Sequence, residues 1–165
     1  MVELLNPEKV ISELPLEKEM SIADFGCGSG GWVIPLAKKS KDAKIYAIDV
    51  LREALSALKG RLEMEKVYNI RTVLADLEKG SGLADDFLDL VLLTNILFQV
   101  DEKEKLIKEA HRTLRRDGML LLVDWEVKED DAENKADKLV RQEGFKKIKE
   151  INAGEDHFAY LYKKE

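Results

Sequence analysis

The sequence has little cysteine, no long apolar run and no excess of positive charge. Its 165 residues hold one cysteine, Cys27, which excludes internal disulfides and any cysteine-rich metal site. No apolar run approaches the ~20 residues that span a bilayer, and the first residues lack the basic and apolar regions of a signal peptide. A formal net charge of −6 disfavours nucleic acid as a partner. We therefore expect a cytoplasmic protein with no membrane span and no metal site.

The composition is that of a folded globular chain. Apolar residues make up 45% of the sequence and charged residues 36%. A chain of this length has room for one sizeable core, and no repeat, low-complexity tract or linker divides it. We therefore predict a single domain over residues 1–165.

A glycine-rich stretch stands between an apolar run and the start of a helix. Residues 20–25 predict a short buried strand, residues 26–31 contain four glycines, and residues 32–39 predict a helix. A strand, a glycine turn and a helix form the nucleotide-binding corner of a doubly wound fold. Glycines let a ligand approach where a Cβ would collide, and the helix start offers free N–H groups to an anionic group.

The glycine spacing fits two different motifs. Gly26, Gly28 and Gly31 satisfy the G-x-G-x-x-G of dinucleotide-binding proteins. Gly26, Gly28 and Gly30 satisfy a tighter G-x-G-x-G, which the acid Asp24 precedes by two residues. The rest of the chain has to decide between them.

Strand-like and helix-like segments alternate along the remaining sequence. Asn6 and Pro7 predict the start of a helix that ends near Leu14. Asp101 and Glu104 form a capping pair for a later helix. The other predicted helices are 51–62 and one through residues 136–140 that stops at Gly144, and the helix that starts after Asp101 ends at Gly118. The predicted strands are 22–25, 44–48, 69–74, 88–93, 119–123, 145–151 and 158–162. The first five strands alternate with helices, whereas a short turn alone joins the last two. Such a turn is too short for a parallel crossover, so that pair must be antiparallel.

Five strand–helix units followed by an antiparallel pair, with Asp24-x-Gly26-x-Gly28-x-Gly30 after the first strand, resemble the class I S-adenosylmethionine (SAM)-dependent methyltransferases. Asp49 at the end of the second strand and Ala75-Asp76-Leu77 after the third are similar to that family's ribose and adenine motifs. The likeness covers nearly the whole chain and is greatest for the small type-11 members. It implies an α/β, doubly wound, Rossmann-like three-layer sandwich with a seven-stranded, mostly parallel sheet.

The resemblance implies SAM as the cofactor and a particular set of residues around it. That set is Asp24, Gly26, Cys27, Gly28, Ser29, Gly30, Asp49, Val50, Asp76, Leu77 and Asn95. Three carboxylates carry alternatives. Asp49 binds the ribose hydroxyls or caps the next helix. Asp76 binds the adenine amino group or is a solvated loop residue, and Asp24 holds the methionine amino group or braces the loop. We interpret Cys27 as a small filler near the ligand, because no histidine lies nearby in sequence to activate it.

The acceptor side is less well defined by the sequence. Phe98 and Trp125 follow strands at the edge where ligands bind in open α/β sheets, and we predict that both contact the acceptor; core packing is the alternative for Phe98. His157 is the best available candidate for a general base. The segment 94–98 lacks the Asn-Pro-Pro-aromatic pattern of enzymes that methylate nucleobase amines, which disfavours DNA as a substrate. We predict a small-molecule acceptor, while a lipid or quinone-type acceptor and a protein side chain stay open.

Two other functions stay open at this point. One is a non-catalytic SAM-binding subunit that stabilises a partner, and the other is an NAD-dependent oxidoreductase. No lid is inserted between the strands, so the N-terminal helix or a second copy of the chain, in a homodimer, would have to close the site.

Overall fold

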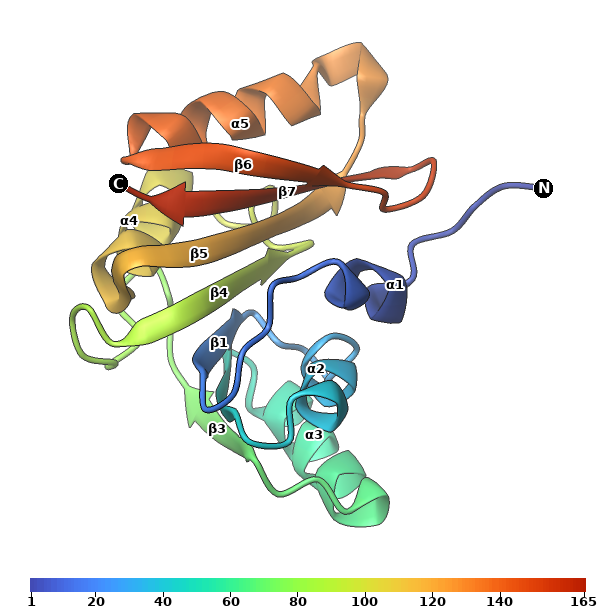
Figure 1. Ribbon diagram of the computed structural model, residues 1–165, viewed down its shortest axis with the longest axis vertical. Helices are drawn as coiled ribbons and strands as arrows, with labels where there is room; N and C mark the ends of the chain where they lie inside the picture. The colour runs from blue at the N-terminus through green and yellow to red at the C-terminus, as the bar shows by residue number, and fades with distance from the viewer.

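A mixed sheet of seven strands runs through the middle of the computed structural model, which describes residues 1–165 (Figure 1). The strand order is β3-β2-β1-β4-β5-β7-β6, and only β7 runs antiparallel to its neighbours. This order and the antiparallel C-terminal pair confirm the predicted fold class. The strands are β1 (Ser21–Phe25), β2 (Lys44–Asp49), β3 (Ile70–Leu74), β4 (Leu88–Thr94), β5 (Leu114–Trp125), β6 (Phe145–Ile151) and β7 (His157–Lys164).

Helices cover both faces of the sheet and make three layers. One apolar core contains residues of the first three helices, and the other contains residues of the last two. The helices are α1 (Pro7–Ser12), α2 (Val33–Lys39), α3 (Arg52–Glu65), α4 (Lys103–Thr113) and α5 (Ala132–Gln142), with a 3₁₀ turn η1 (Lys128–Asp130) before the last. None of them combines the length and the hydropathy that crossing a membrane requires.

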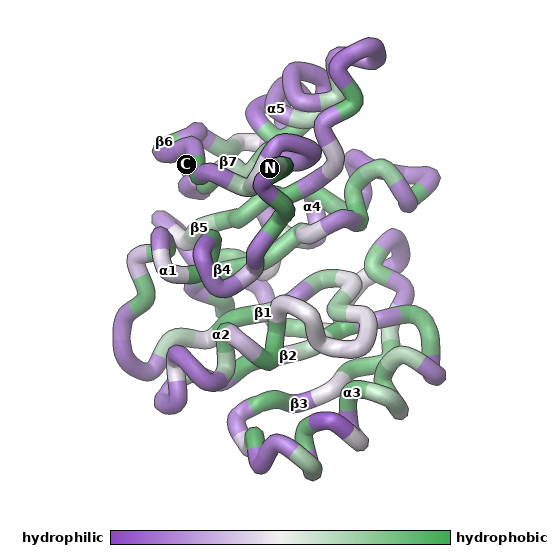
Figure 2. Tube along the Cα trace, turned by 90° about the vertical axis from the view of Figure 1, so that its right-hand side faces the viewer, coloured by the Kyte–Doolittle hydropathy of each residue, from purple (hydrophilic) through white to green (hydrophobic).

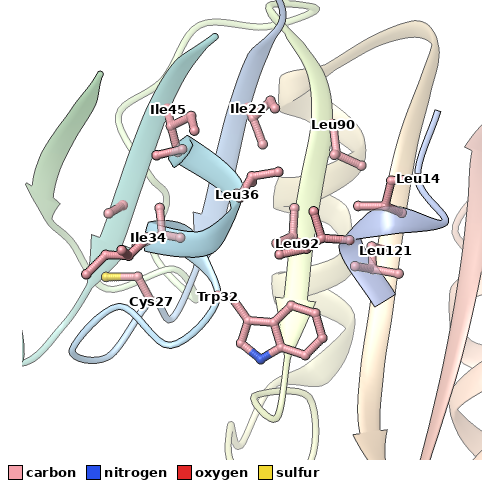
Figure 3. Packing of buried hydrophobic residues seen from close by; sticks show 14 of the residues in the cluster. Leu14, Ile22, Cys27, Trp32, Ile34, Leu36, Ile45, Leu90, Leu92 and Leu121 are labelled. Carbon is pink, nitrogen blue, oxygen red and sulfur yellow. The ribbon is translucent and has the colours of Figure 1, made fainter. Parts of the chain in front are cut away.

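The central strands supply side chains to both cores because successive residues of a strand point to opposite faces. In β4, Leu92 packs against α1 and α2, whereas Val91 and Leu93 face α4 and α5. Figure 3 shows Leu36 of α2 packed among side chains of the strands. Hydrophobic residues accordingly concentrate along the inner strands, and hydrophilic ones along the outer connections (Figure 2). Burial on both faces explains why β4 is almost entirely apolar.

The first helix begins as its sequence predicts. Asn6 is the N-cap of α1, and its Oδ1 accepts hydrogen bonds from the backbone N–H groups of Glu8 at 3.0 Å and Lys9 at 3.3 Å. Pro7 occupies the first helical position, where a missing N–H costs nothing. The helix stops at Ser12, two residues earlier than predicted.

Two predicted boundaries around α4 are wrong. The helix begins at Lys103 with Glu102 at the N-cap, and no side chain caps it, so Asp101 and Glu104 form no capping pair. The helix also ends at Thr113 rather than at Gly118, and β5 begins at once with Leu114. Gly118 lies inside β5, where an added Cβ would be 2.8 Å from the carbonyl oxygen of Arg115. The glycine is therefore required by an irregular strand pairing and not by a helix end.

Candidate active site

The segments that follow β1, β2, β3 and β4 enclose a cavity of about 590 Å³ at the carboxyl edge of the sheet. Open α/β sheets bind ligands at this edge, beside the point where the strand order reverses. Nine of the eleven residues predicted to bind the cofactor line this first cavity: Gly26, Cys27, Gly28, Ser29, Asp49, Val50, Asp76, Leu77 and Asn95. The two that do not are Asp24 and Gly30.

The glycine turn is fixed against the end of β2. The backbone N–H groups of Gly26 and Cys27 both donate to the carbonyl oxygen of Ile48, at 2.8 and 2.9 Å. Gly26 has φ +77°, and an added Cβ would be 2.4 Å from Cδ1 of Ile96. Gly28 has φ +55°, but its missing side chain would meet nothing within 4 Å. Gly26 therefore serves the packing of the turn, whereas Gly28 leaves open space on the cavity side.

Asp49 ties the turn to its own strand through both carboxylate oxygens. Its Oδ2 accepts from the N–H of Gly28 and its Oδ1 from the N–H of Leu51, each at 2.9 Å. Leu51 is the N-cap of α3, and no side chain caps that helix, so the N-cap alternative for Asp49 is wrong. Each carboxylate oxygen can accept a second hydrogen bond. The ribose role therefore stays open to Asp49 as a prediction.

Asp24 is a carboxylate without a partner. It lies in β1 at the centre of the sheet, is fully buried, and neither of its oxygens accepts a hydrogen bond. Burial, together with the nearby Asp49 carboxylate, raises the pKa of Asp24 to about 7. The alternative that Asp24 braces the loop has no hydrogen bond to support it. A buried oxygen without a donor costs free energy, which a donating or cationic group in the adjoining cavity would offset.

Cys27 and Gly30 have structural environments. The Cys27 thiol is buried, and its pKa is raised by that burial and further by Asp24 and Asp49, so it stays a thiol. A thiol in this state is a poor nucleophile, in line with its interpretation as a filler. An added Cβ on Gly30 would be 2.7 Å from Cδ1 of Leu58, so this glycine lets α3 pack closely on the turn.

Asp76, which follows β3, and Asn95, which follows β4, also line the first cavity. Asp76 Oδ1 accepts from the N–H of Glu78 at 3.1 Å, and Lys79 Nζ lies 3.6 Å from Oδ2. Asn95 has φ +54°, and its N–H donates to the carbonyl oxygen of Val123 at 2.8 Å. The side-chain oxygen of Asn95 is buried and unpartnered. Asp24 and Asn95 thus leave three unsatisfied acceptor oxygens at this end of the sheet.

A second cavity of about 590 Å³ contains both residues predicted to contact the acceptor. Phe98 and Trp125 line it together with Asp124 at the end of β5. Gln99 lines both cavities and so stands between them. The side chain of Gln99 donates to the carbonyl oxygen of Asn95 at 2.5 Å, which holds it against the β4–α4 connection.

His157 is not placed to act on a molecule in either cavity. Its ring centroid lies 4.1 Å from that of Trp125, and both ring nitrogens are buried without partners. Burial lowers the pKa of His157, and the charges of Asp124 and Asp156 oppose this shift. Because Trp125, and not His157, faces the second cavity, the prediction of a general base at His157 is unsupported by the geometry.

No residue of α1 lines either cavity, so the N-terminal helix does not close the site in this conformation. It packs instead beside α2, where Val10 and Ile11 are buried. Of the two covers that the sequence left open, α1 does not cover the site in this structure, and a second copy of the chain stays a prediction.

Sequence reasoning selected nine of the residues that line the first cavity and two that line the second, and the lining residues that it did not select include Gln99 and Asp124. Asp124 is the second-last residue of β5, at the same sheet edge as Asp24 and Asp49, so the strand-end rule that selected those acids also applies to it. Gln99 carries no motif, and only the three-dimensional position of the β4–α4 connection shows its role.

Comparisons with known proteins agree with this geometry. A family model described as a methyltransferase domain matches residues 23–122. A segment of 79 residues is 35% identical to a probable cobalt-precorrin-6B C(15)-methyltransferase (decarboxylating) of Methanocaldococcus jannaschii, over 48% of this chain and 38% of that protein. A segment of 124 residues is 27% identical to the ubiquinone/menaquinone biosynthesis C-methyltransferase UbiE of Campylobacter jejuni, over 72% of this chain and 50% of that protein. The chain thus spans no more than half the length of these two relatives.

The fold also matches a solved structure. A SAM-dependent methyltransferase from Aquifex aeolicus superposes with a TM-score of 0.86 at 22% identity. The match covers 97% of this chain and 90% of that one. Because the identity is 22%, this match shows a shared fold and does not bear on the reaction.

Proposed function

The chain belongs to the type-11 methyltransferase domain family, and from this premise we propose that it transfers a methyl group from SAM to a small-molecule acceptor. The observation that carries the proposal is the first cavity, which nine residues selected from the sequence line together. Cytoplasmic location and a homodimer stay predictions from the sequence.

The residues around the first cavity fit SAM. Asp24 does not line the cavity itself, but its buried, unpartnered carboxylate beside the glycine turn would hold an ammonium group through nearby backbone and water. Gly28 leaves space where a Cβ would stand. Asp49 would hold the ribose hydroxyls, and Asp76 would accept from the adenine amino group. When bound, SAM supplies a methyl group already activated on a sulfonium sulfur.

The protein's own contribution is position and the exclusion of water. Gln99 lies between the two cavities, so a molecule in the second cavity has this side chain as its boundary with the first. Alignment of two bound reactants can supply most of the rate enhancement for a reaction of this kind. The aromatic side chains of Phe98 and Trp125 would cover the acceptor on its solvent side. An acceptor atom with a free lone pair needs no general base in either cavity for this mechanism, whereas an ammonium acceptor would first give its proton to a carboxylate, and Asp124 is the buried carboxylate of the second cavity.

Titration calorimetry on the full chain tests the proposal. We expect binding of SAM and S-adenosylhomocysteine, and far weaker binding of NADH. Tighter binding of NADH would reject the methyltransferase function and favour an oxidoreductase. If SAM binds but no acceptor is ever methylated, and a catalytic partner co-purifies in equal amount, the chain is a non-catalytic subunit.

A further inference from the structure

The second cavity has a chemical character that points to one class of acceptor. We propose that it binds an amine carried on a flat apolar body, with the amine held by the free carboxylate oxygen of Asp124. This inference rests on the proposed function, because it names the acceptor of the same site. The argument comes from burial, from the aromatic walls and from the surrounding charge.

Asp124 is the one buried charged side chain in the lining of the second cavity. It is 2% exposed, and its Oδ1 accepts from the N–H of Trp125 at 2.8 Å. Its Oδ2 is buried and accepts no hydrogen bond of normal geometry. Burial raises the pKa of this carboxylate, and the nearby backbone N–H groups of Phe98 and Leu97 oppose that shift less strongly. The other charged groups in the lining are satisfied or solvated: Lys103 Nζ donates to the carbonyl oxygen of Val100 at 2.9 Å, and Asp130 and Lys135 are exposed. A buried carboxylate oxygen calls for a donor, and a cationic donor forms the stronger, charge-assisted bond.

Two partly exposed aromatic side chains form part of the wall of the second cavity. Phe98 is 37% exposed and Trp125 52% exposed, although both are large apolar side chains beside a cavity. Val127, Ala132 and Leu139 continue the apolar lining. A flat apolar molecule would cover these surfaces. Trp is also the aromatic side chain that attracts a cation most strongly, so the same wall favours an ammonium group over an anion.

The connection that borders the second cavity is strongly acidic. Five of the eight residues from 126 to 133 are Asp or Glu, and one is Lys. This segment joins β5 to α5 and contributes Val127, Asp130 and Ala132 to the lining. A cleft bordered by negative charge raises the local concentration of cations and repels anions. The lining also contains two lysines, Lys103 and Lys135, which would favour an anionic acceptor. The experiment below decides between an amine and an anion.

Three phenyl compounds that differ in their head group test the inference by calorimetry. The full chain, saturated with S-adenosylhomocysteine, is titrated with 2-phenylethylamine, 2-phenylethanol and 3-phenylpropionate. We expect the amine to bind at least about tenfold more tightly than the other two. Asp124→Asn should remove this advantage and leave the affinity for the alcohol within about twofold. Asp130→Asn, which changes an exposed carboxylate of the same lining, is the matched control and should leave the amine affinity within about twofold.

The outcomes separate the inference from the proposed function. Equal or tighter binding of the alcohol or the carboxylate overturns the inference, as does an equal effect of the two variants or no binding of the amine at millimolar concentration. If Asp124→Asn does not fold, the comparison of the three compounds on the unmodified chain still decides. If S-adenosylhomocysteine fails to bind, the proposed function is wrong, and the same titrations without it still report whether the second cavity prefers amines.

Discussion

Gly28 donates its backbone N–H to the Oδ2 of Asp49 at 2.9 Å, so the acid that ends β2 holds the turn that follows β1. The other oxygen of Asp49 accepts from Leu51 at the start of α3. One carboxylate thus organises two of the backbone segments that enclose the first cavity. Replacing Asp49 by alanine would therefore remove both its predicted contact with a ribose and its structural role, and binding and stability have to be measured separately.

Asp49→Ala should weaken binding of S-adenosylhomocysteine and also lower stability. Loss of two charge-assisted hydrogen bonds to the ribose, partly replaced by water, predicts about 30- to 150-fold weaker binding, or about 2–3 kcal/mol. The N–H groups of Gly28 and Leu51 lose their acceptors, which should cost about 1–2 kcal/mol of unfolding free energy. Calorimetry and denaturant unfolding measure the two effects. An unchanged affinity with reduced stability would assign Asp49 to the turn alone.

Asp24→Asn should stabilise the ligand-free protein at alkaline pH. The pKa of Asp24 is raised from 3.8 to about 7 by burial and by Asp49, so the folded state holds a proton that the unfolded state has lost between these values. Stability therefore falls as pH rises through this range, by about 4 kcal/mol once Asp24 is ionised in both states. The amide removes that loss. The unfolding free energies at about pH 4 and about pH 8 should differ less in the variant than in the unmodified protein. An equal difference in both proteins would show that Asp24 stays ionised in the folded state over this range.

Gly26→Ala and Gly60→Ala should change stability in opposite directions. At Gly26 the new methyl group meets Ile96 and the backbone keeps a positive φ, so we expect a loss of about 2–4 kcal/mol. Gly60 lies inside α3 with open space where its Cβ would stand, so alanine should add about 0.5–1 kcal/mol. Thermal unfolding of both variants measures this. Similar stability of the two would mean that the turn relaxes around Ile96.

Phe98→Ala separates a cavity wall from a core residue. Phe98 lines the second cavity and not the first, so affinity for S-adenosylhomocysteine should stay within about threefold. Because the ring is 37% exposed, the loss of unfolding free energy should be about 1 kcal/mol rather than the 3–5 kcal/mol typical of a buried phenylalanine. A loss in that higher range would favour the core-packing alternative.

The sequence was most informative where structure depends on neighbouring residues. Asn6 caps α1 because its side chain reaches N–H groups two and three residues away. The strands follow from apolar runs, and the antiparallel C-terminal pair from its short connection, which are local properties. The arrangement of the strands in one sheet follows from the family resemblance and not from these local patterns. The acids at the strand ends could be placed at one edge because parallel strands point the same way.

The sequence did not predict the features that depend on contacts between segments far apart in the chain. The end of α4 depends on the pairing of Leu114 with Leu88 and of Met119 with Leu90, which forces an irregular strand around Gly118. Asp124 is buried with an unsatisfied oxygen in a strand that pairs with β7, a segment that comes after α5 and β6 in the chain. His157 was the best available candidate for a general base, but Trp125, its cross-strand neighbour, packs against its ring.

The shared position of Gln99 has a thermodynamic consequence. Because Gln99 borders both cavities, an occupant of either one would contact the same side chain. If occupation of the first cavity changes the affinity of the second by some factor, linkage requires the reverse effect to be equal. Where that factor differs from one, the affinity of this protein for an acceptor has no single value, and is defined only when the degree of saturation of the first cavity is stated with it.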